Sequence, residues 1–256
     1  MGLTYSEDFK VDFDFCDLKE DIKLPLFLSY CLSVSRRQSL SLNRSDDYLH
    51  KHWVLSWIVT DYDISINRLP HFNETIRIET QAIAYNRLFC YRKFHIYDQS
   101  GNVLMDILAY FALMNPITRR VAQIPDDLVS PYQAPLIKKM PRSPKMKKLE
   151  KSVIQLYKVR YFDIDMNGHV NNSKYLDWMY DALGDDFLQN HRPIHLTLKY
   201  LKEVSAGGQI SSAYHLDGMT SYHDILSEGQ YHAQAMIKWQ KIEKESEINH
   251  CPIKVI

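Results

Sequence analysis

The sequence predicts an α+β protein built from two similar units in tandem, and three observations lead to that prediction. Two segments carry the same order of elements, which is a strand-like opening, one helix and then a run of strands. Several of the predicted strands alternate apolar and polar residues, as strands with one buried face do. A stretch rich in proline and lysine separates the two segments. We therefore expect each unit to wrap a mostly antiparallel sheet around one long helix.

The first unit is expected to occupy residues 1–133. It opens with the strand-like VDFDF, residues 11–15, and a helix is predicted from Leu24 to Leu42. Strands are predicted in HWVLSWIVTDYDISI, residues 52–66, and in the alternating TIRIETQA, residues 75–82. The turn signal DQSG then divides two further apolar runs, which predicts a hairpin.

The second unit, residues 151–256, repeats this order. VIQLYKVRYFD, residues 153–163, is predicted to be a strand. NNSKYLDWMYDALGDDFL, residues 171–188, is predicted to be a helix with an asparagine N-cap and with Gly184 near its end. The strands HLTLKYLKEV, QISSAYHL and YHAQAMIKW follow, separated by turn signals. The segment between the units, residues 134–150, is predicted to be a linker.

Composition restricts the classes of function. The 256-residue chain is 45% hydrophobic and carries 31 basic and 31 acidic residues, so it can build a core and lacks the basic excess of nucleic-acid binders. No apolar run approaches the about 20 residues of a membrane span, and the N-terminus has the pattern of neither a signal nor a transit peptide. The four cysteines show no metal-ligand or disulfide spacing, and Cys90 is more typical of a core thiol than of a nucleophile. We expect a cytoplasmic protein with no cofactor, metal, nucleic acid or membrane partner.

The stretch DIDMNGHVNN, residues 163–172, concentrates short polar side chains just before an amphipathic helix. Asn167, His169 and Asn171 are spaced by two, which would place them on one side of an extended segment. A helix N-terminus offers unpaired N–H groups and a positive dipole end, which can polarise a carbonyl oxygen. A histidine beside it titrates near neutral pH and can transfer protons. The pattern suits acyl transfer to water, and its alternative is a polar turn that only caps the helix.

The same stretch resembles the signature of the acyl-[acyl carrier protein] (acyl-ACP) thioesterases of plants and bacteria. The matching pattern is Asp165-x-Asn167-x-His169-Val170-Asn171-Asn172. Further blocks resemble that family in the same order, namely IRIET at 76–80, MNPITRRV at 114–121, IPDDL at 124–128 and YLKEV at 200–204. The resemblance covers both units and implies a tandem pair of hotdog domains. It also implies hydrolysis of the acyl-ACP thioester, which releases free fatty acid and terminates fatty acid synthesis.

The resemblance carries the family's catalytic set to Asp165, Asn167, His169 and Glu203. Val204 stands where one proposed family mechanism uses a cysteine nucleophile, so we expect water to attack instead. Glu203, helped by His169, would take a proton from that water, and either of the two can carry it. Asn167 would position the water or the base, and backbone N–H groups of residues 170–172 would hold the thioester oxygen. Asp165 would orient the loop or serve a structural role alone.

The first unit lacks this set. Aligned without gaps, it has Lys19 where the second unit has Asn167, and Asp21 where it has His169. The later strand pairing sets Leu69 against Glu203. The resemblance implies that the first unit shapes the acyl-chain pocket. The apolar residues that can line this pocket, or simply form core, are Leu24, Leu26, Phe27, Tyr30, Cys31, Val34, Trp53, Trp57 and Ile58.

The linker carries a basic cluster in an otherwise neutral chain. Its members are Lys138, Lys139, Arg142, Lys145, Lys147 and Lys148. Because acyl carrier proteins are acidic, this cluster can steer the docking of ACP. The alternative is a solvated tether without a partner.

Two other functions fit parts of the pattern. An acyl-coenzyme A thioesterase would keep the fold, but many of those are single hotdog units that dimerise, which the covalent tandem disfavours. An acyl-ligand sensor of the transcription-regulator type would add a DNA-binding module, and the sequence shows no basic helix-turn-helix segment. The presence of Asn167, His169 and Glu203 also favours an enzyme. Because the tandem already supplies a hotdog pair, a monomer and a homodimer both fit.

Overall fold

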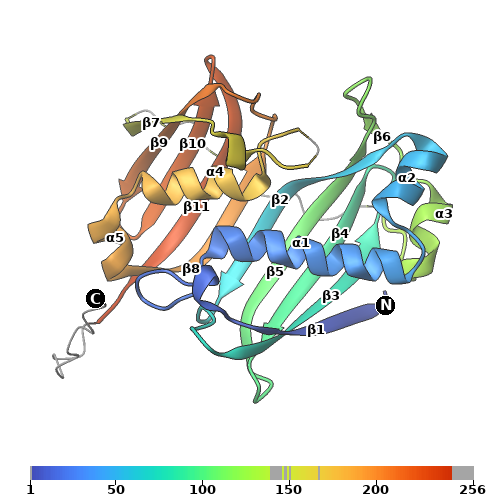
Figure 1. Cartoon of the computed structure of the whole chain (residues 1–256), viewed down its shortest axis with the longest axis horizontal. Helices are drawn as coiled ribbons and strands as arrows, with labels where there is room; N and C mark the ends of the chain where they lie inside the picture. Colours follow the sequence, from blue (N-terminus) through green and yellow to red (C-terminus); the bar gives the residue numbers. More distant parts are fainter. Residues whose placement is uncertain (1, 139–145, 147–148, 150, 167, 244–256) are drawn as a thin grey trace.

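The computed structural model describes residues 2–138, 146, 149, 151–166 and 168–243. Within these residues eleven strands form one sheet, in the order β1-β3-β4-β5-β2-β8-β11-β10-β9-β7, with β6 paired to β5. The helices α1 and α4 each cross one half of the sheet, on the same face (Figure 1). In chain order the elements are β1 (Thr4–Lys10), η1 (Phe13–Phe15), α1 (Leu24–Ser41), α2 (Asp46–Trp53), β2 (Ser56–Ile66), β3 (Thr75–Tyr85), β4 (Phe89–Tyr97), β5 (Val103–Met114), β6 (Val121–Ala122), α3 (Asp126–Val129), η2 (Ser130–Tyr132), β7 (Val153–Lys158), η3 (Tyr161–Asp163), α4 (Asn172–Asp181), α5 (Asp185–Asn190), β8 (His191–Tyr200), β9 (Gln209–Asp217), β10 (Thr220–Ser227) and β11 (Gln230–Lys241).

The N-terminal half packs α1 against the sheet formed by β1 to β5. Pro25 in the first turn presets a helical φ where no backbone N–H is needed. Apolar side chains then recur every three or four residues on one face, and Phe27 and Val34 on that face are fully buried. The helix predicted from Leu24 to Leu42 is confirmed and ends one residue earlier, at Ser41. The predicted hairpin is also confirmed, as β4 and β5.

The C-terminal half repeats this arrangement with a shorter helix. Asn171 caps α4, which ends at Asp181, and Gly184 then adopts a φ of 82°, a conformation that suits glycine. The next helix, α5, starts directly at Asp185. The prediction of one helix over residues 171–188 is therefore wrong in its last part, because the chain breaks at Gly184 and turns into α5.

The strand predicted in VDFDF is wrong. Residues 13–15 form the 3-10 turn η1, in which the N–H of Phe15 donates to the C=O of Asp12 at 3.0 Å. The true strand, β1, lies just before this turn and pairs with β3. Alternating phenylalanine and aspartate imitate a half-buried strand, yet Phe13 is 80% exposed.

The strand predicted over residues 52–66 starts too early. Its first residues close α2, which Ser45 opens by accepting the N–H of Tyr48 on its hydroxyl at 3.1 Å. Val54 ends that helix with a left-handed φ of 52°, and β2 starts at Ser56. Tryptophan and valine favour strands on average, but here the serine cap and two acidic residues in the first turn stabilise a helix.

The two halves meet through β2 and β8, so that their sheets become one continuous sheet. The junction is antiparallel and sets Asp61 opposite Lys199 and Ser65 opposite His195. An ion pair supports it, with Lys199 Nζ 3.4 Å from Asp61 Oδ1, and so does a close histidine–carboxylate contact, with His195 Nε2 2.8 Å from Asp63 Oδ1. The large hydrophobic cluster contains buried residues from both halves, and two smaller clusters lie in the N-terminal half. Loops and helix ends from both halves therefore come together along this seam.

Most of the predicted basic linker lies outside the described residues. Lys138 is described and is exposed. The other five members of the cluster fall outside, as does the predicted catalytic residue Asn167. Across the described ranges, no helix is long and apolar enough to cross a membrane.

Candidate active site

The predicted catalytic stretch forms a tight loop. Ile164 and Val170 form an isolated antiparallel bridge, and inside it the N–H of Asp165 donates to the C=O of His169 at 2.8 Å. Gly168 turns the loop with a φ of 80°. The expectation that alternate residues of this stretch share one side of an extended segment is therefore wrong, because the chain turns back between the two paired ends.

Asp163 fixes the entry to this loop. Its carboxylate is 1% exposed, accepts the N–H of Arg160 at 2.8 Å and lies 3.2 Å from the Arg160 guanidinium. Its C=O accepts the N–H of Asn171 at 2.8 Å on the far side of the loop. Because these bonds bend the chain, β7 ends at Lys158, and the strand predicted over residues 153–163 is too long.

Two further side chains hold the end of the loop. Asp165 Oδ1 accepts the N–H of His169 at 3.3 Å. Asn171 Oδ1 accepts the N–H and the hydroxyl of Ser173 at 3.0 and 2.9 Å, and so caps α4. The hydroxyl of Ser29 in α1 donates to the same oxygen at 3.3 Å. Asn171 is thus a helix cap that also joins the two halves.

Glu203 follows β8 in a short loop that is anchored from two sides. The hydroxyl of Tyr175 in α4 accepts the N–H of Val204 at 2.9 Å. Burial raises the pKa of Tyr175 to about 12, so this hydroxyl keeps its proton. On the other side, the N–H of Leu201 donates to the C=O of His232 in β11 at 2.8 Å. The backbone on both sides of Glu203 is therefore fixed.

The loop before α4 and the loop after β8 bring His169 and Glu203 together. His169 Nε2 lies 3.3 Å from Glu203 Oε2, which makes an ion pair whenever the imidazole is protonated. The guanidinium of Arg119, from the N-terminal half, contacts the same Oε2 atom. The side chains of His169, Glu203 and Arg119 are 42%, 32% and 45% exposed, so a substrate can reach them from solvent.

The structure places three of the four predicted catalytic residues in one site. These are Asp165, His169 and Glu203. The N–H groups of residues 170–172 were expected to hold the thioester oxygen, but that of Asn171 is already used by Asp163.

Arg119 is the residue of this site that sequence reasoning missed. It lies 84 positions before Glu203, in the other half of the chain. The signal that pointed to it was the MNPITRRV block, which carried the family resemblance but suggested no role for any residue.

Among the described residues, no group of three or more histidine, cysteine, aspartate or glutamate side chains is placed to hold a metal ion. Burial raises the pKa of Cys90 to about 12, which is typical of an inert core thiol.

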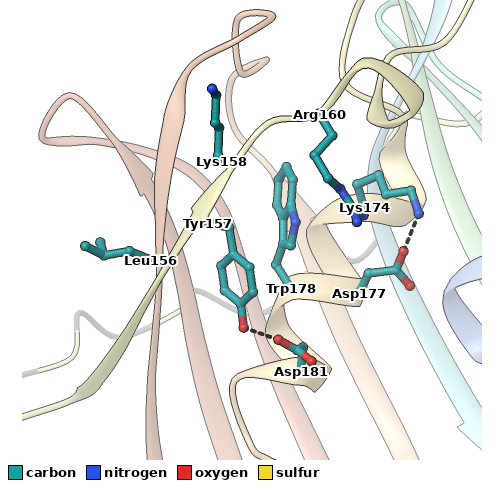
Figure 2. Close-up of a pocket in the computed structure, with 8 residues that line it drawn as sticks. All are labelled: Leu156, Tyr157, Lys158, Arg160, Lys174, Asp177, Trp178 and Asp181. Carbon is teal, nitrogen blue, oxygen red and sulfur yellow. Dashed lines mark hydrogen bonds and ion pairs between the residues drawn. The ribbon is translucent and has the colours of Figure 1, made fainter.

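A groove of about 590 Å³ lies between β7 and α4 (Figure 2). The hydroxyl of Tyr157 donates to Asp181 at 2.6 Å across it, and Lys174 Nζ lies 2.8 Å from Asp177 at its other end. The groove carries charges of both signs, and none of the three described catalytic candidates, Asp165, His169 and Glu203, lines it.

A second cavity, of about 310 Å³, lies at the seam where the start of α1 meets α4. Leu24 and Leu26, two of the residues expected to line an acyl pocket, line it together with Leu69 and Trp239. Others in that expectation are buried in the main core, namely Phe27, Cys31 and Val34.

Comparisons with known proteins cover both halves. The family model of the acyl-ACP thioesterase N-terminal domain matches residues 2–132, and that of the C-terminal domain matches residues 146–241. A chloroplastic acyl-[acyl-carrier-protein] hydrolase of Cuphea viscosissima is 30% identical over 171 residues, which cover 64% of this chain and 42% of that protein. A chloroplastic dodecanoyl-[acyl-carrier-protein] hydrolase of Umbellularia californica is 27% identical over 183 residues, which cover 68% of this chain and 48% of that protein. The chain thus spans less than half the length of these curated relatives.

Solved structures match almost the whole chain. A Lactobacillus plantarum protein assigned provisionally as an oleoyl thioesterase has a TM-score of 0.90 at 30% identity, covering 95% of this chain and 98% of that one. The 12:0-ACP thioesterase of Umbellularia californica has a TM-score of 0.81 at 22% identity, and the match covers 94% of this chain and 99% of that one. This second match supports the fold. The predicted α+β fold of two tandem hotdog units is therefore confirmed, and the chain belongs to the acyl-ACP thioesterase family.

Proposed function

We propose that this protein hydrolyses the thioester of acyl-ACP, releases the free fatty acid and so terminates fatty acid synthesis. The observation that carries the proposal is the pair of His169 and Glu203, whose side chains meet beside the N-terminus of α4. Family membership supports the substrate class, because the named relatives are acyl-[acyl-carrier-protein] hydrolases. Asp165, Asn167, His169 and Glu203 remain the proposed catalytic set.

In the proposed reaction, Glu203 and His169 take a proton from a water molecule as its oxygen bonds to the thioester carbon. The carbonyl oxygen gains negative charge, which the N–H groups of Val170 and Asn172 at the start of α4 stabilise. The carbon–sulfur bond then breaks, and the leaving thiolate of the carrier arm receives the proton taken from water. The product acid loses its own proton to solvent, so no further reactant is needed.

The remaining assignments belong to the same proposal. ACP is the proposed partner, and the basic linker is a proposed docking surface for it. The N-terminal half is proposed to hold the acyl chain, and the 310 Å³ cavity lined by Leu24 and Leu26 supports a role for apolar residues at the seam. A cytoplasmic location and a homodimer are also proposals.

The test is thiol release from a panel of ACP and coenzyme A thioesters, with His169→Ala and Glu203→Ala measured alongside the parent protein. The proposal expects turnover that is selective for ACP thioesters and lost in both variants, and the panel then also reports the preferred chain length. Faster turnover of coenzyme A thioesters would move the assignment to an acyl-coenzyme A thioesterase. Binding of acyl ligands without any turnover by the parent would contradict an enzyme and favour a sensor.

A further inference from the structure

We infer that Arg119 is a positioning residue for Glu203. The N-terminal half thereby supplies a residue to the active site of the C-terminal half. The inference rests on the proposed hydrolysis. Its first support is the direct contact between the Arg119 guanidinium and Glu203 Oε2 across the seam of the two halves. An arginine–carboxylate contact is directional, because the planar guanidinium fixes the carboxylate's orientation more firmly than a lysine would.

The loop that carries Arg119 is closed by its own hydrogen bonds. Asn115 Oδ1 accepts the N–H of Ile117 at 3.0 Å and that of Thr118 at 2.8 Å. The C=O of Asn115 accepts the N–H of Arg119 at 2.9 Å, and the N–H of Asn115 donates to the C=O of Arg120 at 3.0 Å. The arginine is therefore presented from a defined turn between β5 and β6.

The backbone of Arg119 is unusual for an arginine. Its φ is 57°, in the left-handed region that glycine adopts without steric cost. Its side chain is 45% exposed, so burial of the side chain does not offset that cost. A left-handed residue persists where the surrounding structure holds it, as the closed turn does here, and the head group of this side chain reaches Glu203.

The contact also distinguishes the two oxygens of Glu203. Oε2 faces both Arg119 and His169. Among the described residues, the side-chain hydrogen bond to Glu203 goes to Oε2, and no hydrogen bond goes to Oε1. Arg119 thus holds Oε2 and leaves Oε1 to take the proton from the attacking water, which assigns the general base to Glu203.

The central variant is Arg119→Gly, because glycine relieves the backbone while removing the side chain. We expect a Tm equal to or above that of the parent and a loss of roughly 10–100-fold in kcat, as a misplaced catalytic group causes. The loss should be the same for acyl-ACP and for the N-acetylcysteamine thioester of the same acyl chain, with KM little changed. Arg119→Lys should restore part of kcat, and Arg120→Ala, the neighbouring exposed arginine, should behave like the parent.

Three results would overturn the inference. Parent-like kcat in Arg119→Gly would show that Glu203 needs no such support, while hydrolysis by the parent would leave the proposed function intact. A rise in KM for acyl-ACP alone would make Arg119 a docking residue. The third test measures Tm and therefore needs no activity. If the two side chains share one contact, the shifts in Tm of Arg119→Gly and Glu203→Gln should not add up to that of the double variant. Additive shifts would contradict the contact even if the parent proved inactive.

Discussion

The loops that precede α1 and α4 share one backbone design but carry different side chains. In the loop before α1, the N–H of Asp17 donates to the C=O of Asp21 at 2.8 Å, and the N–H of Glu20 donates to the C=O of Asp17 at 3.1 Å. A bridge between Cys16 and Ile22 closes the loop. Asp17 Oδ1 also accepts the N–H of Asp21 at 3.1 Å. The loop before α4 makes each of these bonds with its corresponding residues.

The side chains on this shared backbone do different things. Lys19, which aligns with Asn167, donates from Nζ to the C=O groups of Leu188 and His191 at 2.8 and 3.0 Å, and so ties the two halves together. Asp21, which aligns with His169, faces His71. The loop is thus a shared scaffold, and one copy of it supports the proposed chemistry while the other supports the seam. The aspartate at the first position occurs in both loops, which indicates that Asp165 shapes the loop.

A large difference in kcat is expected when this shared aspartate is removed from each loop. Asp165→Ala removes the acceptor of the His169 N–H, and a displacement of about 1 Å at a catalytic group can cost roughly 100-fold in kcat. Asp17→Ala removes the same support from the other loop and should lower Tm without changing kcat. Steady-state kinetics and thermal unfolding of both variants check this. Similar losses of kcat in the two variants would contradict the division of roles.

The next effect concerns Lys19, the residue of the first loop that aligns with Asn167. Lys19→Met removes two charged hydrogen bonds between the halves, and we expect it to lower the free energy of unfolding by about 2 kcal/mol. Denaturant unfolding measures this, and kcat should stay at the parent value. Lys23→Met is the matched control, because Lys23 Nζ donates to the C=O of Asp14 within the same half, at 3.1 Å, and to no other described residue. An equal effect in the control would show that Lys19 does not hold the seam.

The two halves should also differ in what they contribute to the loss of stability in acid. In the C-terminal half, burial lowers the pKa of His223 to about 3, with Nε2 2.8 Å from Ser221 Oγ. The N-terminal half instead buries Arg92, which keeps its charge throughout this range. Unfolded His223 binds a proton below pH about 6.5, whereas the folded protein resists that proton down to about pH 3. Stability is therefore lost as pH falls through this window, by up to about 1.4 kcal/mol per pH unit.

His223→Gln should flatten this acid dependence, because glutamine does not titrate. Urea unfolding at several pH values between about 6 and 4 gives the unfolding free energy of the parent and of the variant. The slope of this free energy against pH should be smaller in the variant. Parallel slopes would show that carboxylates elsewhere, and not His223, cause the loss of stability in acid.

The smallest expected effect lies in the turn residues of the two loops. Gly168 has a φ of 80° and the corresponding Glu20 a φ of 62°. A Cβ at Gly168 would meet nothing within 4 Å, so Gly168→Ala should cost only the backbone penalty of about 1 kcal/mol. Glu20→Gly relieves the same conformation and should not lower stability. Thermal unfolding of both variants measures these effects. A lower Tm for Glu20→Gly would show that the Glu20 side chain stabilises the loop by more than its left-handed backbone costs.

The sequence predicted the parts of this molecule that depend on local patterns. Helix α1 and the β4–β5 hairpin follow from apolar spacing and a turn signal. The ungapped pairing of Asn167 with Lys19 agrees with the hydrogen bonds that the two loops share. Local patterns failed where they were ambiguous, as in VDFDF, whose alternation fits a strand although the chain turns there.

The residues of the candidate site were predictable where a motif of the family resemblance carried them. Asp165 and His169 lie in a single motif, and Glu203 came from a second block of the family resemblance. Arg119 was not predictable, because its contact with Glu203 exists only after β2 and β8 join the two halves. The asparagine N-cap was predicted and is confirmed at Asn171, whereas the spacing of two that set Asn171 on one extended side with His169 was misleading, because the segment is a tight loop.

One assay can compare the two loops. It measures the kcat for acyl-ACP hydrolysis of His169→Ala beside that of Asp21→Ala, the variant at the aligned position. We expect a loss of roughly 10²–10⁴-fold for His169→Ala, because His169 takes part in the proposed proton transfer, and a parent-like kcat for Asp21→Ala. Parent-like hydrolysis by His169→Ala, or an equal loss in both variants, would contradict the placement of the chemistry at the start of α4.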